Sequence, residues 1–300
     1  MKIIKPKVIT NTIFKGSNVP ENDHPEWLVT STYQIGNKVI VTGETHEIFE
    51  SLVNGNIAKD PPTEPTQWLS LGATNRWKVF DKKISDPTIN PTSITYQLQD
   101  AASVINAMSF FGLVAQTVNL TVTADGTEVY NKTADLNNTV DVTDWYSYFF
   151  TEITTDTETS FLDIPPFINS VLAITVTNAA GSNAQVGQIV SGFLTNIGLT
   201  TYGTSISIED YSTKEVDAFG NFVITKRAFA NIGDYNIAFN TQNARRIQNT
   251  LAALRAEPIV FIGSDDTSYG LTLYGFYRRF DLTLETPSLS FGSVEVEGLT

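Results

Sequence analysis

The chain has 300 residues, a net charge of −13 from 19 Lys and Arg against 32 Asp and Glu, and no cysteine. Nucleic-acid binding is unfavourable for so acidic a chain, and disulfides, thiolate metal sites and a cysteine nucleophile are excluded. With 41% hydrophobic and 17% charged residues, the composition is typical of a globular protein with a core.

Residues 1–24 contain Pro6, Pro20 and a polar turn at 16–18, which predict an extended arm or a partner-docking segment. The basic N-terminus is not followed by the apolar stretch of a signal peptide. The longest apolar run, 110–116, is too short to cross a bilayer. We therefore expect a soluble protein, made in a cytoplasm and without membrane insertion.

Residues 25–76 predict a small module of three short strands at 31–35, 38–41 and 45–50, followed by a Pro-rich loop that returns to Trp68. Three of the four tryptophans of the chain fall between 27 and 77. A domain of about fifty residues has little core. Its large aromatic residues therefore either fill that core or form a binding surface.

The order of aromatic, glycine and proline residues in this module is similar to that of small chitin-binding-type carbohydrate modules, families 5 and 12. The matching residues are Trp27, Tyr33, Gly36, Val39, Gly43, Phe49, Pro61, Trp68 and Gly72. The resemblance implies binding of glycan by stacking of sugar rings on aromatic faces. The candidate glycan-binding residues are Trp27, Tyr33, His46 and Trp68, with His46 standing where these modules carry an exposed aromatic. The alternative is that Tyr33 and Trp68 belong to the core, while Trp27 fits either interpretation.

The stretch from Trp68 to Asp81 joins the module to the body of the chain. Asn75, Arg76 and Trp77 are expected to form a structural polar joint or an interface anchor, since arginine is enriched at interfaces.

Residues 77–185 predict an antiparallel β-sandwich or jelly roll. Strands are expected at 93–98, within the apolar stretch 101–116 (whose first half could also be helical), and at 118–123, 128–130 and 170–177. Asp125-Gly126 predicts a tight hairpin turn because the two residues tolerate positive φ.

Residues 186–300 predict a second β-rich domain with one helix. The helix is expected over 241–256, where Ala244, Ile247, Leu251 and Leu254 recur at helical spacing before Pro258. Strands are expected at 204–210, 220–227, 258–263, 272–277, 280–284 and 289–299. The whole chain is therefore expected to be mainly β.

Motifs spread over residues 25–300 resemble a family of tailed-bacteriophage virion proteins. They lie at 68–81, 144–150, 199–204, 210–214, 219–220, 227 and 274–276, and the segment Thr74-Asn75-Arg76-Trp77 is the most specific. Lys78-Val79 departs from the Ala-Met of the family. The resemblance implies a structural component of the tail tip or baseplate, made in the bacterial host, whose partners are other tail proteins and copies of itself.

Catalytic motifs are absent from the sequence. There is no Gly-rich phosphate loop and no Gly-x-Ser-x-Gly elbow, and His24 and His46 stand alone. The least implausible carboxylate pairs are Asp141 with Asp144 and Glu209 with Asp210, and residues 265–268 read better as a solvated turn than as a calcium site. We expect no enzyme, no cofactor and no metal.

The leading hypothesis is a non-enzymatic, oligomeric virion protein whose module binds host-surface glycan. A lectin, or a glycoside hydrolase with an accessory module, is the competing hypothesis. A virion protein in which the module is only a scaffold is a third.

Overall fold

The computed structural model describes residues 1–138, 144–150, 154–216, 219–265 and 269–299. It divides the chain into two compact units, Lys7–Ile189 and a second one made of Met1–Pro6 with Val190–Thr300. We call them the sandwich unit and the split unit. Paired strands dominate both, and this confirms the expected mainly β fold with a sandwich-like body.

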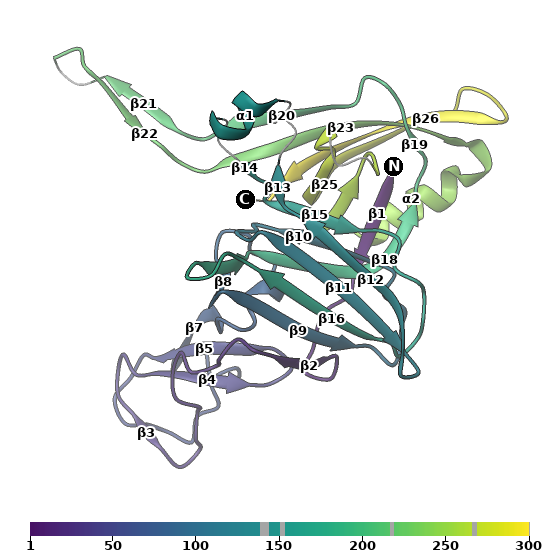
Figure 1. The fold of residues 1–300 in the computed structure, drawn as a ribbon. Helices are drawn as coiled ribbons and strands as arrows, with labels where there is room; N and C mark the ends of the chain where they lie inside the picture. The colour runs from purple at the N-terminus through teal and green to yellow at the C-terminus, as the bar shows by residue number, and fades with distance from the viewer. Residues whose placement is uncertain (139–143, 151–153, 217–218, 266–268, 300) are drawn as a thin grey trace. The chain divides into compact units, whose positions relative to one another are not determined.

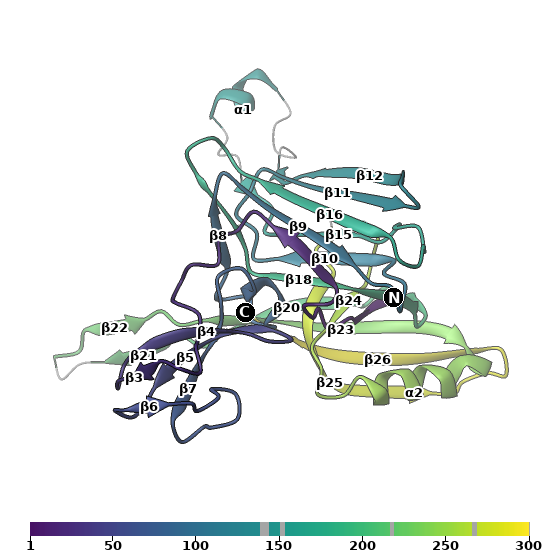
Figure 2. The same ribbon diagram turned by 90° about the horizontal axis from the view of Figure 1, so that it is seen from below.

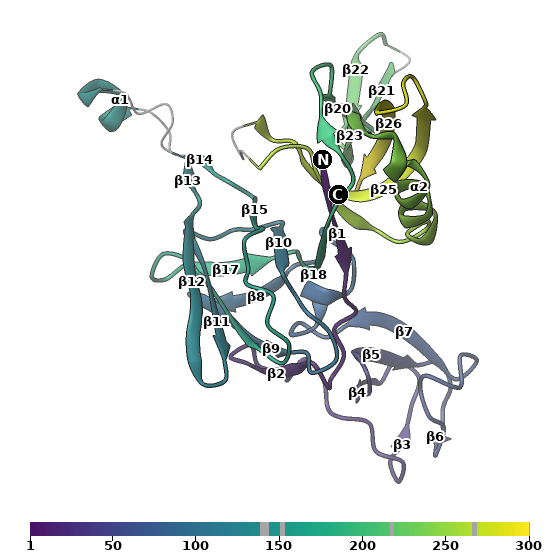
Figure 3. The ribbon, with the colours of Figure 1, turned by 90° about the vertical axis from the view of Figure 1, so that its right-hand side faces the viewer.

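The small module lies within the sandwich unit. Its sheet has the order β4-β5-β7, formed by β4 (Lys38–Thr42), β5 (His46–Ser51) and β7 (Trp68–Ala73). A second pair joins β3 (Thr32–Tyr33) to β6 (Asn56–Ile57). Figure 3 shows these strands gathered together, apart from the larger sheet of the same unit.

The larger sheet has five antiparallel strands in the order β12-β11-β16-β9-β2. The strands are β2 (Phe14–Ser17), β9 (Ser93–Gln99), β11 (Thr117–Ala124), β12 (Thr127–Asp135) and β16 (Val171–Thr177). Residues of β9, β11 and β16 alternate between buried and partly exposed positions, so one face of the sheet covers the core. The expected hairpin is confirmed: Asp125 and Gly126 both have positive φ (49° and 77°) between β11 and β12.

A second layer closes this core. Strand β10 (Ala107–Phe111) is buried at every position and pairs with β15 (Glu158–Phe161), and β8 (Thr88–Pro91) pairs with β17 (Asn183–Val186). Met108, Phe110 and Phe161 share one apolar cluster with residues of the five-stranded sheet. The shorter elements of this unit are η1 (Lys78–Phe80), β13 (Asn137–Asn138), α1 (Trp145–Phe150) and β14 (Thr154–Thr155).

The split unit is one antiparallel sheet in the order β18-β1-β24-β25-β26-β23-β19, with β20 also pairing with β23. Its strands are β1 (Lys2–Pro6), β18 (Gln188–Asn196, which begins in the sandwich unit), β19 (Leu199–Thr200), β20 (Ser205–Asp210), β23 (Phe229–Asn240), β24 (Ile259–Ile262), β25 (Thr272–Thr283) and β26 (Leu289–Gly298). Strands β21 (Thr213–Val216) and β22 (Phe222–Thr225) form a separate ribbon.

The helix of the split unit is confirmed as α2 (Ala244–Ala253), preceded by the 3-10 turn η2 (Thr241–Asn243). Ile247, Leu251 and Leu254 face the sheet and are buried there with Tyr235 and Phe261. Figure 2 shows α2 running along β25 and β26.

Residues 1–24 do not form the expected extended arm. Strand β1 is hydrogen-bonded to β18 on one side and to β24 on the other, and Ile3 and Ile4 are both fully buried. Adjacent residues of a strand point to opposite faces, so both faces of β1 are covered. Strand β2 forms the edge of the five-stranded sheet beside β9.

Two further strands differ from the expectation. Strand β23, the longest strand together with β25 in the described part of the chain, was not predicted. The segments expected separately at 272–277 and 280–284 form the single strand β25, which continues through a bulge between Tyr277 and Arg279.

Candidate functional site

Three of the four candidate glycan-binding residues meet in the small core of the module. Trp68 is 2% exposed, contacts Val39 and Phe49, and donates from Nε1 to the carbonyl of Lys59 at 3.0 Å. The Tyr33 ring stands edge-on to it at 5.2 Å. Trp27 and Tyr33 pack on this core and are only partly buried. Trp68 therefore has no free face for a sugar ring, and the core interpretation describes its position.

His46 does not lie with these three aromatic residues. His46 is 7% exposed, and its imidazole lies tilted by 32° against the Trp77 ring, with the ring centroids 4.6 Å apart. Its Nδ1 lies 2.8 Å from Oε1 of Glu21. The four candidate residues therefore form no common aromatic platform.

Asn75, Arg76 and Trp77 lie where the chain passes from the module into the sandwich, and a buried carboxylate is at the centre of this joint. Glu21 accepts from Thr74 Oγ1 at 2.7 Å and from Arg76 Nη1 at 3.0 Å, besides its contact with His46. The side chain of Glu21 is only 10% exposed. Arg76 also donates from Nε to the carbonyl of Val19 at 2.7 Å.

The neighbours of Arg76 extend the joint in both directions. Asn75 bonds the backbone of Ile89 twice, donating from Nδ2 to its carbonyl at 2.9 Å and accepting from its N–H at 3.0 Å. The Tyr96 hydroxyl donates to the carbonyl of Arg76 at 2.7 Å, and burial raises the pKa of Tyr96. Trp77 is 2% exposed and packs on Phe14 at 5.2 Å. These contacts connect the module with strands β2 and β9 of the five-stranded sheet.

A small cavity of about 240 Å³ adjoins this joint. Glu47, Ser70, Trp77, Asp81 and Lys83 are among its lining residues. Glu47 accepts from Ser70 Oγ at 3.1 Å, and burial raises the pKa of Asp81. Its aromatic lining residues are Trp77, which is almost fully covered, and Phe80, which is partly buried.

Of the carboxylate pairs considered from the sequence, only Glu209 with Asp210 lies wholly within the described residues, and these two side chains do not converge. Glu209 and Asp210 are consecutive residues of β20 and so point to opposite faces of the strand. Asp141 and residues 266–268 lie outside the described residues, and Asp265 pairs with Lys2 at 2.7 Å. Among the described residues, no three His, Asp or Glu side chains gather as a metal site would need. No helix of the described chain combines the length and apolarity needed to span a membrane.

The most conspicuous surface feature is a projecting apolar ribbon. Hairpin β20–β23 continues outward into β21 and β22, and Figure 1 shows this ribbon extending away from the other strands of the split unit. Its apolar side chains are 53% to 91% exposed; they are Val216, Phe219, Phe222, Val223 and Ile224. Only the strand at 220–227 was expected from the sequence. The consecutive apolar residues 222–224 indicated a strand with apolar residues on both faces, but not that these faces are exposed.

A second group of exposed aromatics lies on α1 in the sandwich unit. Trp145, Tyr146 and Phe149 are 79%, 72% and 69% exposed. Trp145 and Phe149 are four residues apart and so share one face of this short helix. Contiguous exposed apolar surface is a common feature of interaction sites.

Comparison of the chain with models of protein families, with curated proteins and with solved structures finds no match.

Proposed function

We propose that the chain is a non-enzymatic structural subunit that associates with copies of itself in the tail tip or baseplate of a tailed bacteriophage. The observation that carries the proposal is the apolar ribbon β21–β22. A two-stranded ribbon is at best marginally stable alone in water. This one also has apolar residues on both faces, because Phe222 and Val223 are consecutive in one strand and both exposed.

The amount of exposed apolar surface supports a role in assembly. A fully exposed aromatic residue has a solvent-accessible area of about 200 Å², and valine and isoleucine have somewhat less. With their exposed fractions, the five apolar residues of the ribbon expose on the order of 500 Å² of surface. A specific interface buries about 800 Å² on each partner. The ribbon with its flanking residues therefore approaches the size of one half of such an interface, and a neighbouring subunit is the natural cover for it.

The place in a phage tail rests on the sequence resemblance. Several motifs that carry this resemblance fall on the exposed apolar segments. Residues 144–150 include α1, residues 210–214 lead into the ribbon, and Phe219-Gly220 lies at its far end. A structural family that used these segments for contacts between subunits would share residues at these places.

The proposal is tested first by the association of the purified chain. Sedimentation velocity over a range of concentrations should show a defined oligomer. Ile224→Ser on the ribbon should weaken it, because Ile224 is 70% exposed and contributes apolar contact area. The matched control is Ile35→Ser in the module, where the isoleucine is 62% exposed. A wild-type chain that is monomeric at every concentration would refute self-association.

The location is tested by labelling. An antibody against the chain should mark one end of the tail in electron micrographs of phage particles, and copy number per particle would give the symmetry. Absence from every particle would refute the virion assignment and favour a free lectin.

Glycan binding, which the resemblance of the module implies, remains a prediction. Trp27 and Tyr33 are the two candidate aromatics that keep part of their surface exposed. Retention of the chain on immobilised chitin would test the prediction.

A further inference from the structure

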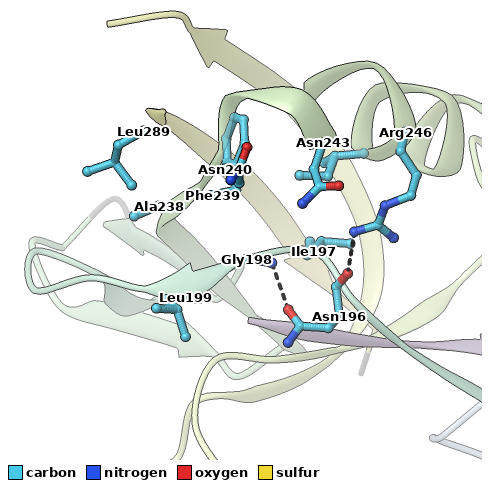
Figure 4. A pocket seen from close by; sticks show the side chains of 11 residues that line it. Asn196, Ile197, Gly198, Leu199, Ala238, Phe239, Asn240, Asn243, Arg246 and Leu289 are labelled. Carbon is cyan, nitrogen blue, oxygen red and sulfur yellow. Dashed lines mark hydrogen bonds between the residues drawn. The ribbon is translucent and has the colours of Figure 1, made fainter. Parts of the chain in front are cut away.

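A basic groove lies between α2 and strands β1 and β18 of the split unit. Its volume is about 650 Å³, and Lys5, Thr195, Arg245, Arg246 and Asn249 are among the lining residues. The lining residues include three cations and no carboxylate. A second hollow of about 410 Å³, whose lining residues Figure 4 shows, shares Arg246 with this groove.

The basic side chains of this groove lack carboxylate partners, which is unusual in an acidic protein. Elsewhere in the described chain, basic side chains commonly meet carboxylates: Lys7 lies 2.8 Å from Asp100, and Arg279 lies 2.7 Å from Asp281. Within the described residues, Lys5 and Arg245 have neither an ion pair nor a side-chain hydrogen bond.

Arg246 is held in place without being neutralised. It donates from Nη2 to the carbonyl of Asn196 at 3.3 Å (Figure 4). This bond orients the guanidinium and leaves its charge unpaired. Three like charges along one groove repel one another, and a bound anion would remove that cost.

The groove is shaped for a segment of chain rather than for a single ion. From Arg245 to Ala253, which both line the groove, the helix rises about 12 Å, and this matches roughly four residues of extended polypeptide. Register places Lys5 opposite Phe193 and Ile3 opposite Thr195, so all four share the face of the sheet that α2 covers in part. Phe193 is 51% exposed and offers an apolar contact beside the cations.

We propose that this groove, lined by Lys5, Arg245 and Arg246, binds an acidic surface segment from the sandwich unit of a second copy of this chain. The charge distribution favours this occupant. The sandwich unit carries 9 Lys and Arg against 20 Asp and Glu, a net charge of −11, whereas the split unit carries 10 against 12, a net charge of −2. Two identical acidic chains repel overall, and a local basic groove that meets an acidic segment would offset this repulsion and set the orientation of the copies.

This inference rests on the proposed self-association and names one contact within it. The first test is charge reversal, followed by sedimentation of the full chain. Arg245→Glu should raise the dissociation constant about tenfold at low salt, and the difference from wild type should shrink at about 500 mM salt, where charges are screened within a few ångströms. The matched control is Arg255→Glu, an exposed arginine just beyond α2 that does not line the groove. It should change the dissociation constant less than twofold.

The second test identifies the partner residues. A carbodiimide joins lysine to carboxylates in direct contact. In an equal mixture of ¹⁴N- and ¹⁵N-labelled chains, Lys5 should form mixed-isotope crosslinks to Asp or Glu of residues 7–189. Crosslinks elsewhere with none at Lys5 would overturn the proposal.

The outcomes separate the two proposals. If Ile224→Ser weakens the oligomer but Arg245→Glu does not, the groove proposal fails and self-association stands. A monomeric wild type refutes both. If the chain binds a labelled oligonucleotide and Arg245→Glu abolishes this binding, the occupant of the groove is a phosphate polymer and not a second copy of the chain. This result would also overturn the proposal.

Discussion

Removal of the Arg76 side chain should destabilise the sandwich unit strongly. In Arg76→Ala the carboxylate of Glu21, only 10% exposed, loses its guanidinium partner at 3.0 Å, and the carbonyl of Val19 loses its bond at 2.7 Å. Removing one partner of a buried ion pair typically costs about 3–5 kcal/mol. Thr74 and His46 still contact Glu21, and Arg76 itself is 24% exposed, so we take the lower end, about 3 kcal/mol.

Urea unfolding followed by tryptophan fluorescence measures this cost. All four tryptophans lie in the sandwich unit, so the signal reports the unfolding of that unit and not of the split unit. With a slope of about 2 kcal/mol per molar urea, the midpoint should fall by roughly 1.5 M. The urea midpoint of Arg76→Lys should lie between those of wild type and Arg76→Ala, because one ammonium cannot reproduce the forked donation to Glu21 and Val19.

The control is Lys132→Ala, which removes an ion pair of similar length, 2.9 Å to Asp163, between side chains that are 52% and 56% exposed. Exposed pairs contribute about 0.5 kcal/mol or less. An Arg76→Ala midpoint within error of the Lys132→Ala midpoint would refute the assignment of the joint as a main source of stability.

Two more predictions concern single positions in each unit. Gly275 lies opposite Gly298 in the β25–β26 pair, where a Cβ would collide with the carbonyl of Glu297, so Gly275→Ala should cost the split unit at least about 3 kcal/mol by hydrogen exchange. Burial, reinforced by the charge of Asp156, raises the pKa of Glu158 from 4.5 to about 7. The folded state therefore keeps a proton that the unfolded chain releases, and stability falls as pH rises from about 4.5 to 7. Glu158→Gln removes this loss. Its free energy of unfolding should equal that of wild type at pH 4 and exceed it by about 3 kcal/mol at pH 7.5, since one pKa unit corresponds to about 1.4 kcal/mol. Urea midpoints that match those of wild type at both pH values would contradict the assignment.

The parts of the fold that follow from local chemistry could be predicted from the sequence. The Asp125-Gly126 turn specifies its hairpin because few residue pairs accept positive φ at both positions. Helix α2 follows from the spacing of Ile247, Leu251 and Leu254, which is the same in the sequence and in the packed structure. In both cases the decisive contacts lie within a few residues along the chain.

The role of β1 could not be predicted because its partners are distant in sequence. Lys2 pairs with Asn196 and Ile262, and nothing within the N-terminal segment 1–24 indicates either contact. The prolines suggested an exposed segment, whereas Pro6 in fact ends a central strand. The adjacent isoleucines Ile3 and Ile4 were the available signal for a strand buried on both faces.

The joint could be predicted only in part. Asn75, Arg76 and Trp77 stood out by composition, but their central partner Glu21 lies 55 residues before Arg76. For the same reason His46 was expected on a glycan-binding surface, although Glu21 and Trp77 hold it in the interior. The exposure of the ribbon could not be predicted either, since a strand pattern in the sequence does not tell whether another sheet covers the strand.

The central position of β1 has a consequence for the order of folding. The whole sandwich unit, Lys7–Ile189, is an insertion between two neighbouring strands of the split unit, since Pro6 pairs with Gly192. During synthesis the inserted unit is complete before β24, the other neighbour of β1, has been translated. At a translation rate of about 5–20 residues per second, Ile3 and Ile4 therefore lack their final neighbours for on the order of ten seconds or more after synthesis. A folded sandwich unit shortens the effective loop between β1 and β18, which lowers the entropy cost of pairing these two strands. Strand β24, the other neighbour of β1, is synthesised later and completes the pairing.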